Sequence, residues 1–256
     1  MSVSASGESL ECGPIILTKH PARCCVDNPE LDRLNELIGE FNVFEAAGLR
    51  RDEVKHSRFL SFLLSPQEAH GLGEGFLRPF LQRAIRASER TDLPVSPLDL
   101  ELWSLADAEV RVEWQSIDLL ILVPGRKLAV VFENKIGSGE HSDQLNRYLT
   151  RVHQQYPGWK VLPLFLSPQG TPPTDERYLP VTYEIIVGLL DHLLDTRSAS
   201  MGDAVRLALR HYAQLLRRHV VSDSEIRELC QSIYRKHKAA IDLIVEHTSF
   251  RRAMAW

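Results

Sequence analysis

The segment 117–148 constrains the fold more than any other part of the chain. Two apolar strands are expected on either side of a Pro-Gly turn, the first opening on Asp118 and the second closing on Glu133, Asn134 and Lys135. Side chains alternate between the faces of a strand, so a hairpin with this turn sets Asp118 across from Glu133, with Cβ atoms roughly 5 Å apart. A turn tightened by two residues also keeps both acids on one face, and only a one-residue bulge separates them.

Two carboxylates this close on an apolar hairpin repel each other and resist ionising together. A hard divalent cation between them removes the repulsion, and oxygen ligands suit Mg²⁺ or Mn²⁺. Lys135 beside such a metal could hold a water or stabilise charge on an oxyanion. Gln144 and Tyr148 are four residues apart and therefore share one face of a helix that begins just after the acids. An ordinary hairpin with a chance acid at each end is the alternative.

This pattern resembles the PD-(D/E)xK nuclease superfamily, although Ile117 stands where the family's name has proline. The resemblance implies an α/β fold with a restriction-endonuclease-like core, an α-β-β-β-α-β mixed sheet flanked by helices, here with a helical C-terminal extension. It implies the following roles: Asp118, Glu133 and the backbone carbonyl of Asn134 as metal ligands, Lys135 as the catalytic lysine, and Gln144 and Tyr148 as the Q-x-x-x-Y element.

The segment 53–66, followed by His70-Gly71, resembles the N-terminal signature of one branch of this superfamily, E-x-x-H-S-x-F-L-x-x-L-L-x-P and then H-G. The resemblance makes Glu53, on the first core helix, a candidate third acid at the metal; a solvated acid at a helix start is the alternative. His56 could orient a carboxylate or contact phosphate, or it is a structural histidine. Ser57 and His70 are expected to cap or brace turns.

The segment 109–114 alternates apolar and charged residues, as expected of a strand leading into the hairpin. Its apolar members, ending with Trp114, should share one face, and its charged members, ending with Glu113, the other. Glu113 is a candidate supporting acid, because the strand before the aspartate often carries one in the superfamily it resembles. A plain edge-strand charge is the alternative.

Beyond the hairpin, a buried strand is expected over 159–167 and helices over 185–194, 204–216 and 222–247. Basic residues on the helices form the candidate nucleic-acid contacts: Arg147 and Arg151 beside the Gln144 face, and Arg235, Lys236 and Lys238 on the last helix. In both places a solvated helix face is the alternative.

Length and composition predict one sizeable core in an ordinary globular protein. We expect a loose tail over 1–28, a nuclease-like core over 29–196 and a helical extension over 197–256. The chain carries −4 overall, with ten Lys and Arg against six Asp and Glu from Met201 onward. That balance permits a nucleic-acid enzyme without arguing for one. No helix-stop signal closes the sequence, and the related branch runs longer, so either the C terminus is truncated or Arg251 and the residues after it pack on a partner.

The expected cellular compartment is inferred from three features that the sequence lacks: a membrane span, a secretory signal and cysteines at metal-site spacing. Its apolar runs are too short to span a bilayer, and the N terminus has no basic region followed by an apolar block. The four cysteines (Cys12, Cys24, Cys25 and Cys230) have no metal-site spacing, so reduced thiols in a cytoplasmic protein are expected.

Together these observations predict a Mg²⁺- or Mn²⁺-dependent nuclease that cleaves DNA, with a role in bacterial defence guessed from the resemblance. Three alternatives stay open. The first is a non-catalytic or trigger-dependent relative that binds nucleic acid or protein. The second is an RNA-cleaving enzyme or toxin, and the third is an unrelated α/β protein. For the predicted nuclease itself, DNA is the expected partner and RNA the alternative, and a homodimer or a defence-system protein is a further candidate partner.

Overall fold

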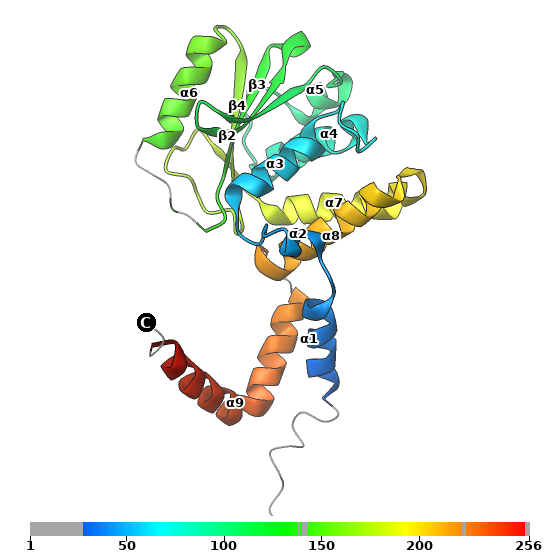
Figure 1. The fold of residues 1–256 in the computed structure, drawn as a ribbon. Coiled ribbons are helices and arrows are strands. Elements are labelled where there is room, and N and C mark those ends of the chain that lie inside the picture. Colours follow the sequence, from blue (N-terminus) through cyan, green and yellow to red (C-terminus); the bar gives the residue numbers. More distant parts are fainter. Residues whose placement is uncertain (1–27, 138, 140–142, 222–223, 254–256) are drawn as a thin grey trace, which may run out of the picture. The chain divides into compact units, whose positions relative to one another are not determined.

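The structure, a computed structural model, describes residues 28–137, 139, 143–221 and 224–253 of the chain (Figure 1). Its residues fall into two units: 40–224, and 1–39 together with 225–256. The predicted tail, apart from Asn28, and the last three residues lie outside the described part. The units do not coincide with the predicted boundaries at 29 and 197, and that domain division stays a prediction.

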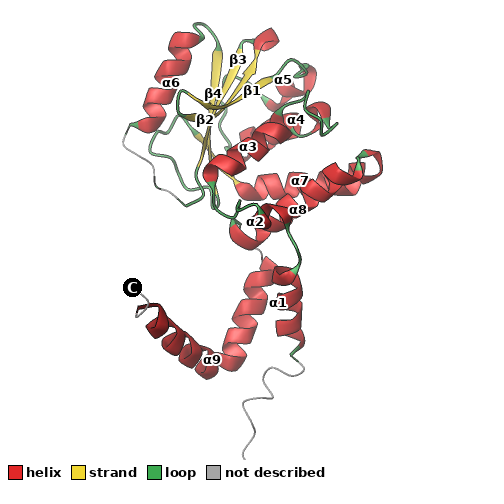
Figure 2. Cartoon of the chain, viewed as in Figure 1, coloured by secondary structure: helices red, strands yellow, loops and turns green. Residues whose placement is uncertain are grey.

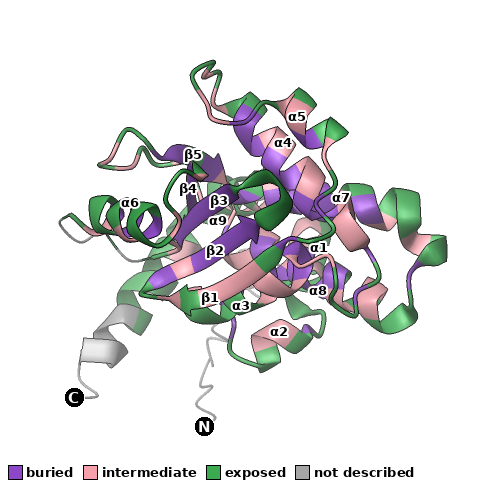
Figure 3. Ribbon diagram, turned by 90° about the horizontal axis from the view of Figure 1, so that it is seen from above, coloured by how far each residue is buried: buried purple, intermediate pink, exposed green. Residues whose placement is uncertain are grey.

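Unit 40–224 is built on one mixed sheet (Figure 2). Its five strands follow the order β1-β2-β3-β4-β5, as seen from above in Figure 3. The strands are β1 (Glu109–Trp114), β2 (Ile117–Val123), β3 (Leu128–Asn134), β4 (Lys160–Ser167) and β5 (Leu179–Thr182). The first three pair antiparallel, and β3, β4 and β5 pair parallel. Every residue of β3 is buried, as expected of a central strand covered on both faces.

Helices cover both faces of this sheet (Figure 1). Those of this unit are α2 (Val43–Ala46), α3 (Glu53–Leu64), α4 (Leu77–Ala87), α5 (Pro97–Leu102), α6 (Gln144–Gln155), α7 (Tyr183–Arg197) and α8 (Asp203–His219), with short 3-10 turns η2 (Gly73–Gly75), η3 (Pro124–Arg126) and η4 (Ser198–Ser200). Helix α6 packs on β3 and β4, while α3, α4 and α7 contact β1, β2 and β5. The predicted mixed α/β fold flanked by helices is confirmed; β5 and α2 were not predicted.

Two apolar cores lie on the two faces of the sheet (Figure 3). The larger takes alternate residues of β2 and β3, such as Leu119 and Phe132, together with the helices α3, α4, α7 and α8. The smaller takes the other set, such as Leu120 and Val131, together with α6. Asp118 lies two residues before Leu120, and its side-chain interaction with Glu133, which contacts Gln144 of α6, places it on the α6 face. Ile117 also packs in the smaller core, so the alternation of β2 is broken at its first residue.

The register of the β2–β3 hairpin is the predicted one, because Val123 pairs with Leu128 and Leu119 pairs with Phe132. The loop between the strands closes with Lys127 in a left-handed conformation, φ +47°. Gly125 donates its backbone N–H to Asp107 Oδ2 at 2.8 Å. A Cβ on Gly125 would lie 2.9 Å from the same oxygen, so the close approach favours glycine here.

The predicted alternation of β1 fails at its last residue. Val110 and Val112 pack on the larger core, but Trp114 packs on the smaller one, against Tyr156. Glu113 between them has φ +53°, a left-handed backbone that reverses the strand's alternation. The expectation that Trp114 shares the face of the two valines was therefore wrong.

The other unit contains α1 (Pro29–Gly39) and α9 (Ser224–Ala253). Asn28 begins α1 by accepting the N–H groups of residues 30 and 31 at 3.2 Å. Glu30 pairs with Lys236 at 2.8 Å and accepts the Ser232 hydroxyl at 2.9 Å, which ties the two helices together. Helix α9 bends at His237, where φ is −124° and ψ is 24°.

The features that bear on compartment are few. Cys230 is free and exposed, and the other three cysteines lie outside the described residues. Within the part of the chain that the structure describes, none of the helices combines the length and apolar character needed to cross a bilayer. Reduced thiols and a cytoplasmic location stay predictions.

Candidate active site

Two acids meet where β2 begins and β3 ends. Asp118 Oδ2 accepts the backbone N–H of Asn134 at 2.7 Å, which continues the β2–β3 pairing through a side chain. Glu133 is completely buried on the same, α6-facing side of the sheet. The hairpin thus brings the two predicted acids together, as the spacing of the sequence required.

Glu133 is the hub of the polar contacts. Its Oε1 atom lies 3.0 Å from Lys135 Nζ and accepts an N–H from Gln144 at 2.9 Å. Gln144 also donates to the hydroxyl of Tyr148, one turn further along α6. The structure therefore gathers Asp118, Glu133, Lys135, Gln144 and Tyr148, the predicted set from the hairpin and the helix after it.

Glu53 lies at the edge of this cluster, at the first position of α3. Its Oε1 atom accepts the backbone N–H groups of Ile136 at 2.7 Å and Gly137 at 3.1 Å. Asp52 caps the helix by accepting the N–H of Lys55 at 3.1 Å. The chain leaving Lys135 is thus fastened to the start of α3, and the Glu53 charge acts on both carboxyls of the pair.

Burial and mutual repulsion disfavour ionisation of the acids. Burial is the largest cause that raises the pKa of Glu133, and the charge of Asp118 is the next. The charge of Lys135 opposes them, and the resulting pKa is about 8. Burial likewise raises the pKa of Asp118, although the Asn134 N–H and the Lys135 charge work against the rise. Both carboxyls therefore hold protons more tightly than free acids do, and a cation that replaces the proton gains from both.

Lys135 responds in the opposite direction. Its side chain is 13% exposed, and this burial alone would lower the pKa of the ammonium group. The charge and hydrogen bond of Glu133, with the charges of Asp118 and Glu53, outweigh burial, so the pKa of Lys135 is raised. Lys135 is consequently a fixed cation at neutral pH, suited to electrostatic stabilisation and not to accepting a proton.

The side chain of Asn134 anchors the site from the opposite face of the sheet. Its amide donates to Ser57 Oγ at 3.1 Å, and its carbonyl oxygen accepts the hydroxyl of Tyr183 at 2.7 Å. No such role of Tyr183 was predicted from the sequence. Ser57 was expected only to cap or brace a turn. A buried Asn within E-N-K needs partners for its amide, and that need was the available signal.

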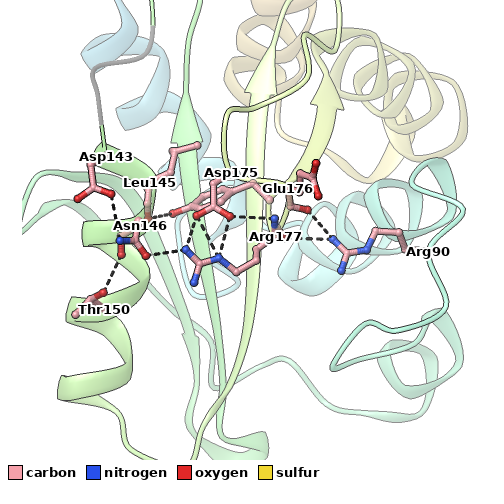
Figure 4. A network of polar contacts seen from close by, with 9 residues as sticks. Arg90, Asp143, Leu145, Asn146, Thr150, Asp175, Glu176 and Arg177 are labelled. Carbon is pink, nitrogen blue, oxygen red and sulfur yellow. Dashed lines mark hydrogen bonds and ion pairs between the residues drawn. The ribbon is translucent and has the colours of Figure 1, made fainter.

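Helix α6 is held in place by contacts from the loop before β5 (Figure 4). Arg177 pairs with Asp175 and donates to Asn146 Oδ1 at 2.8 Å, while Asn146 donates to Asp143 at 3.1 Å. Arg90 donates to the backbone carbonyl of residue 176 at 3.1 Å. These contacts fix the first turn of the helix, from which Gln144 reaches Glu133.

Two predicted supporting residues lie apart from the carboxylate pair. His56 is buried, with Nδ1 3.0 Å from the Tyr212 hydroxyl, and burial lowers its pKa to about 4. A histidine that is neutral at pH 7 in this position serves packing. Glu113 forms an exposed ion pair with Arg58 at 3.3 Å.

The predicted basic contacts are divided between the two units. Arg147 is exposed, and Arg151 donates to the carbonyl of residue 115. In the helical unit, Lys236 pairs with Glu30, Lys238 with Asp242, and Arg235 donates to a carbonyl of its own helix. Nearby acids thus neutralise both lysines, which leaves little local positive potential for binding a nucleic-acid backbone.

A cavity of about 500 Å³ adjoins the site and was not predicted from the sequence. Its lining includes Ile136, directly after Lys135, and the basic residues Arg51, Arg218 and His219. Arg218 pairs with Glu45 at 2.9 Å and is 6% exposed, so it is a structural cation. Arg51 is exposed and makes no hydrogen bond or ion pair with the residues that the structure describes.

The chemistry of the pair fits a hard divalent cation. Glu133 Oε2 and Gln144 Oε1 are buried oxygens without a hydrogen-bond partner within the described parts of the chain. Such oxygens, beside a second carboxylate, are ligands that Mg²⁺ or Mn²⁺ prefers. Among the described residues no group of three or more His, Cys, Asp and Glu side chains could hold a metal, so the side chains offer a pair and not a closed cage.

The family model described as the PD-(D/E)XK nuclease superfamily matches residues 41–236, well over half of the chain. The protein belongs to the PD-(D/E)XK nuclease superfamily. Neither a curated protein nor a solved structure matches the chain. Membership supports nuclease activity on a nucleic-acid substrate and leaves the roles of individual residues to be proposed.

Proposed function

We propose that this member of the PD-(D/E)XK nuclease superfamily is a metal-dependent nuclease that hydrolyses phosphodiester bonds in DNA. One observation carries the proposal. Glu133 is buried, its Oε1 atom contacts both Lys135 and Gln144, and its Oε2 atom has no hydrogen-bond partner among the described residues. A purely structural carboxylate would be fully paired, because an unpartnered buried oxygen costs stability.

Each residue then has a task. Asp118 and Glu133 would hold Mg²⁺ or Mn²⁺, with the backbone carbonyl of Asn134 as a further ligand, and Glu53 would add negative charge close by. When bound there, the cation lowers the pKa of a coordinated water and neutralises charge that develops on the phosphate. Lys135 stabilises that charge or positions the attacking water. Gln144 orients the water or the lysine, and Tyr148 supports Gln144.

Substrate binding needs positive charge beside this acidic pair. The cavity at Ile136 supplies it, because Arg51 lines that cavity and has no acid bound to it among the described residues. We propose that a phosphodiester next to the scissile one lies there. A role in defence against foreign DNA, in the cytoplasm and with a second copy or another defence protein as partner, completes the proposal.

The test is a digest of plasmid, linear DNA, single-stranded DNA and RNA side by side, with Mg²⁺, Mn²⁺ or EDTA. We expect metal-dependent loss of DNA, and a fall of several orders of magnitude in rate for Lys135→Ala because a stabilising charge is lost at the reacting phosphate. Lys160→Ala is the matched control, since Lys160 is exposed at the other end of the parallel strands and contacts Trp103.

The outcomes separate the alternatives. DNA cleavage that requires metal and Lys135 supports the proposal. Cleavage confined to RNA overturns the substrate but leaves the site intact. Equal cleavage by Lys135→Ala and wild type would place catalysis elsewhere. Tight DNA binding without cleavage, in every metal, would favour a binding module.

A further inference from the structure

A second cavity, of about 480 Å³, lies between η2, α4 and α7. Its lining is rich in basic side chains: Arg78 and Arg83 from α4, and His192 and Arg197 from α7. Glu74 is the acid among its lining residues. This volume is in the range of pockets that hold small molecules.

One arginine of the cavity is already satisfied by the protein. Arg78 binds Glu74 and donates to the backbone carbonyl of Trp103 at 2.8 Å. The other oxygen of Glu74 accepts the N–H of Leu105 at 2.8 Å and the hydroxyl of Ser104 at 3.2 Å. This pair is therefore neutral, and it fastens η2 and α4 to the segment before β1.

The other two arginines have no such compensation. The guanidinium groups of Arg83 and Arg197 form no hydrogen bond or ion pair with any residue in the described ranges; Arg197 only accepts the Ser200 hydroxyl at its backbone carbonyl, at 2.9 Å. Asp191, on α7 beside the cavity residue His192, is bound instead to Arg217 of α8. Two positive charges thus line one cavity without an acid bound to either, an arrangement that an anion would stabilise.

Glycines make the room that these guanidinium groups occupy. A Cβ on Gly75 would lie 2.5 Å from Arg197 Nη1, and a Cβ on Gly188 would lie 3.4 Å from Arg83 Nη1. Arg197 therefore rests on the backbone of η2, and any side chain at Gly75 would displace its guanidinium. The backbone of Gly75 is not left-handed, so alanine fits there except for this contact.

We propose that this cavity binds the phosphate group of a nucleotide-sized ligand, with Arg83 and Arg197 as its anion contacts. Guanidinium groups from two walls suit a phosphate, which accepts paired N–H groups from arginine. The apolar part of the lining, such as Leu72 and Leu193, would contact the rest of the ligand. The phosphate belongs either to a free phosphorylated molecule or to a nucleic-acid backbone.

This cavity is separate from the active site. Asp118 and Glu133 face α6, whereas α4 and α7 lie on the opposite face of the sheet (Figures 1 and 3). Along α7, His192 is nine residues from Tyr183, which binds Asn134, or about 14 Å at the helical rise. Binding at this cavity can therefore be measured without any cleavage.

The experiment is calorimetric titration of the full chain in EDTA with pyrophosphate, AMP and a short oligothymidylate that lacks terminal phosphates. We expect saturable binding of at least one probe. The dissociation constant should rise roughly tenfold or more in Arg83→Ala and in Arg197→Ala, because each variant loses a charged hydrogen bond to the phosphate. Gly75→Ala should also weaken binding, although it retains both arginines. Arg86→Ala, an exposed arginine of α4 outside the cavity lining, should bind as wild type does.

The outcomes distinguish a free phosphorylated ligand from a nucleic-acid backbone, or they overturn the proposed site. Binding of AMP or pyrophosphate alone identifies a free ligand, and binding of the oligothymidylate with the same arginine dependence identifies a backbone. Absence of binding by all three probes overturns the proposal, provided that circular dichroism shows a folded protein. So does affinity that is unchanged when both arginines are replaced, or that depends on Lys135 instead.

Discussion

Replacing Glu133 by glutamine should stabilise the metal-free protein at alkaline pH. Glutamine keeps an oxygen for the contacts with Lys135 Nζ and the Gln144 amide, at 3.0 and 2.9 Å in the wild type. It removes the charge that burial and Asp118 make unfavourable. Glu133 is central to the proposed chemistry, and its ionised carboxylate should therefore reduce the free energy of unfolding when no metal is present.

The size of the effect follows from the pKa shift. The pKa of Glu133 rises from 4.5 to about 8, and at about 1.36 kcal/mol per unit this gives at most about 5 kcal/mol. Because the folded-state pKa is the higher one, the favourable contribution of this carboxyl is complete below about pH 4.5 and is lost as the pH rises through about 8. Rearrangement around the pair reduces the effect, so we expect about 2–5 kcal/mol.

The assay is urea unfolding of wild type and Glu133→Gln in EDTA at about pH 6 and about pH 9, which covers the upper part of the interval from pH 4.5 to about 8 over which the contribution is lost. The stability of the variant relative to wild type should rise between these two conditions. Saturating Mg²⁺ should stabilise wild type and have no such effect on the variant. Glu109→Gln, an exposed acid on β1, is the control and should follow wild type. Equal pH dependence of Glu133→Gln and wild type would show that Glu133 is not destabilised by ionisation in the folded protein.

Three further predictions concern the surroundings of the pair. Tyr183→Phe removes the hydroxyl that donates to Asn134 and should cost about 1–3 kcal/mol in urea unfolding; unchanged stability would remove Tyr183 from the anchor. Arg51→Ala should raise KM with kcat nearly constant and reduce the slope of log affinity against log salt by about one, whereas a fall in kcat alone would contradict a binding role. Gln144→Ala should lower kcat by roughly tenfold or more, while Gln154→Ala, exposed on the same helix, should not; equal rates would exclude Gln144 from the site.

The central hairpin could be predicted because its geometry is local. Two apolar strands and a loop of fixed length set the pairing of Val123 with Leu128, and the two-residue period of a strand carries that pairing to Asp118 and Glu133. Gln144 and Tyr148 followed from helical spacing. Family resemblance then supplied the chemistry, and the family match confirmed the superfamily.

Contacts between distant segments could not be predicted in this way. Tyr183 binds Asn134 across 49 positions of sequence. It is the first residue of α7 and directly follows β5, a short strand that contains Pro180 and was not expected. Trp114 changed faces because Glu113, a residue that rarely adopts φ above zero, does so here. The cavity beside Ile136 is lined by four separate segments of the chain, and no local sequence pattern predicts that these segments lie side by side.

The most direct test of the account is a parallel titration of Mn²⁺ binding and DNA cleavage, by wild type and by Asp118→Asn. Asparagine retains an acceptor for the N–H of Asn134 and removes one charge of the pair. Binding and cleavage by wild type should rise over the same range of Mn²⁺, and both should be lost in the folded variant. Undiminished cleavage by Asp118→Asn, with Mn²⁺ bound as tightly as in wild type, would contradict it.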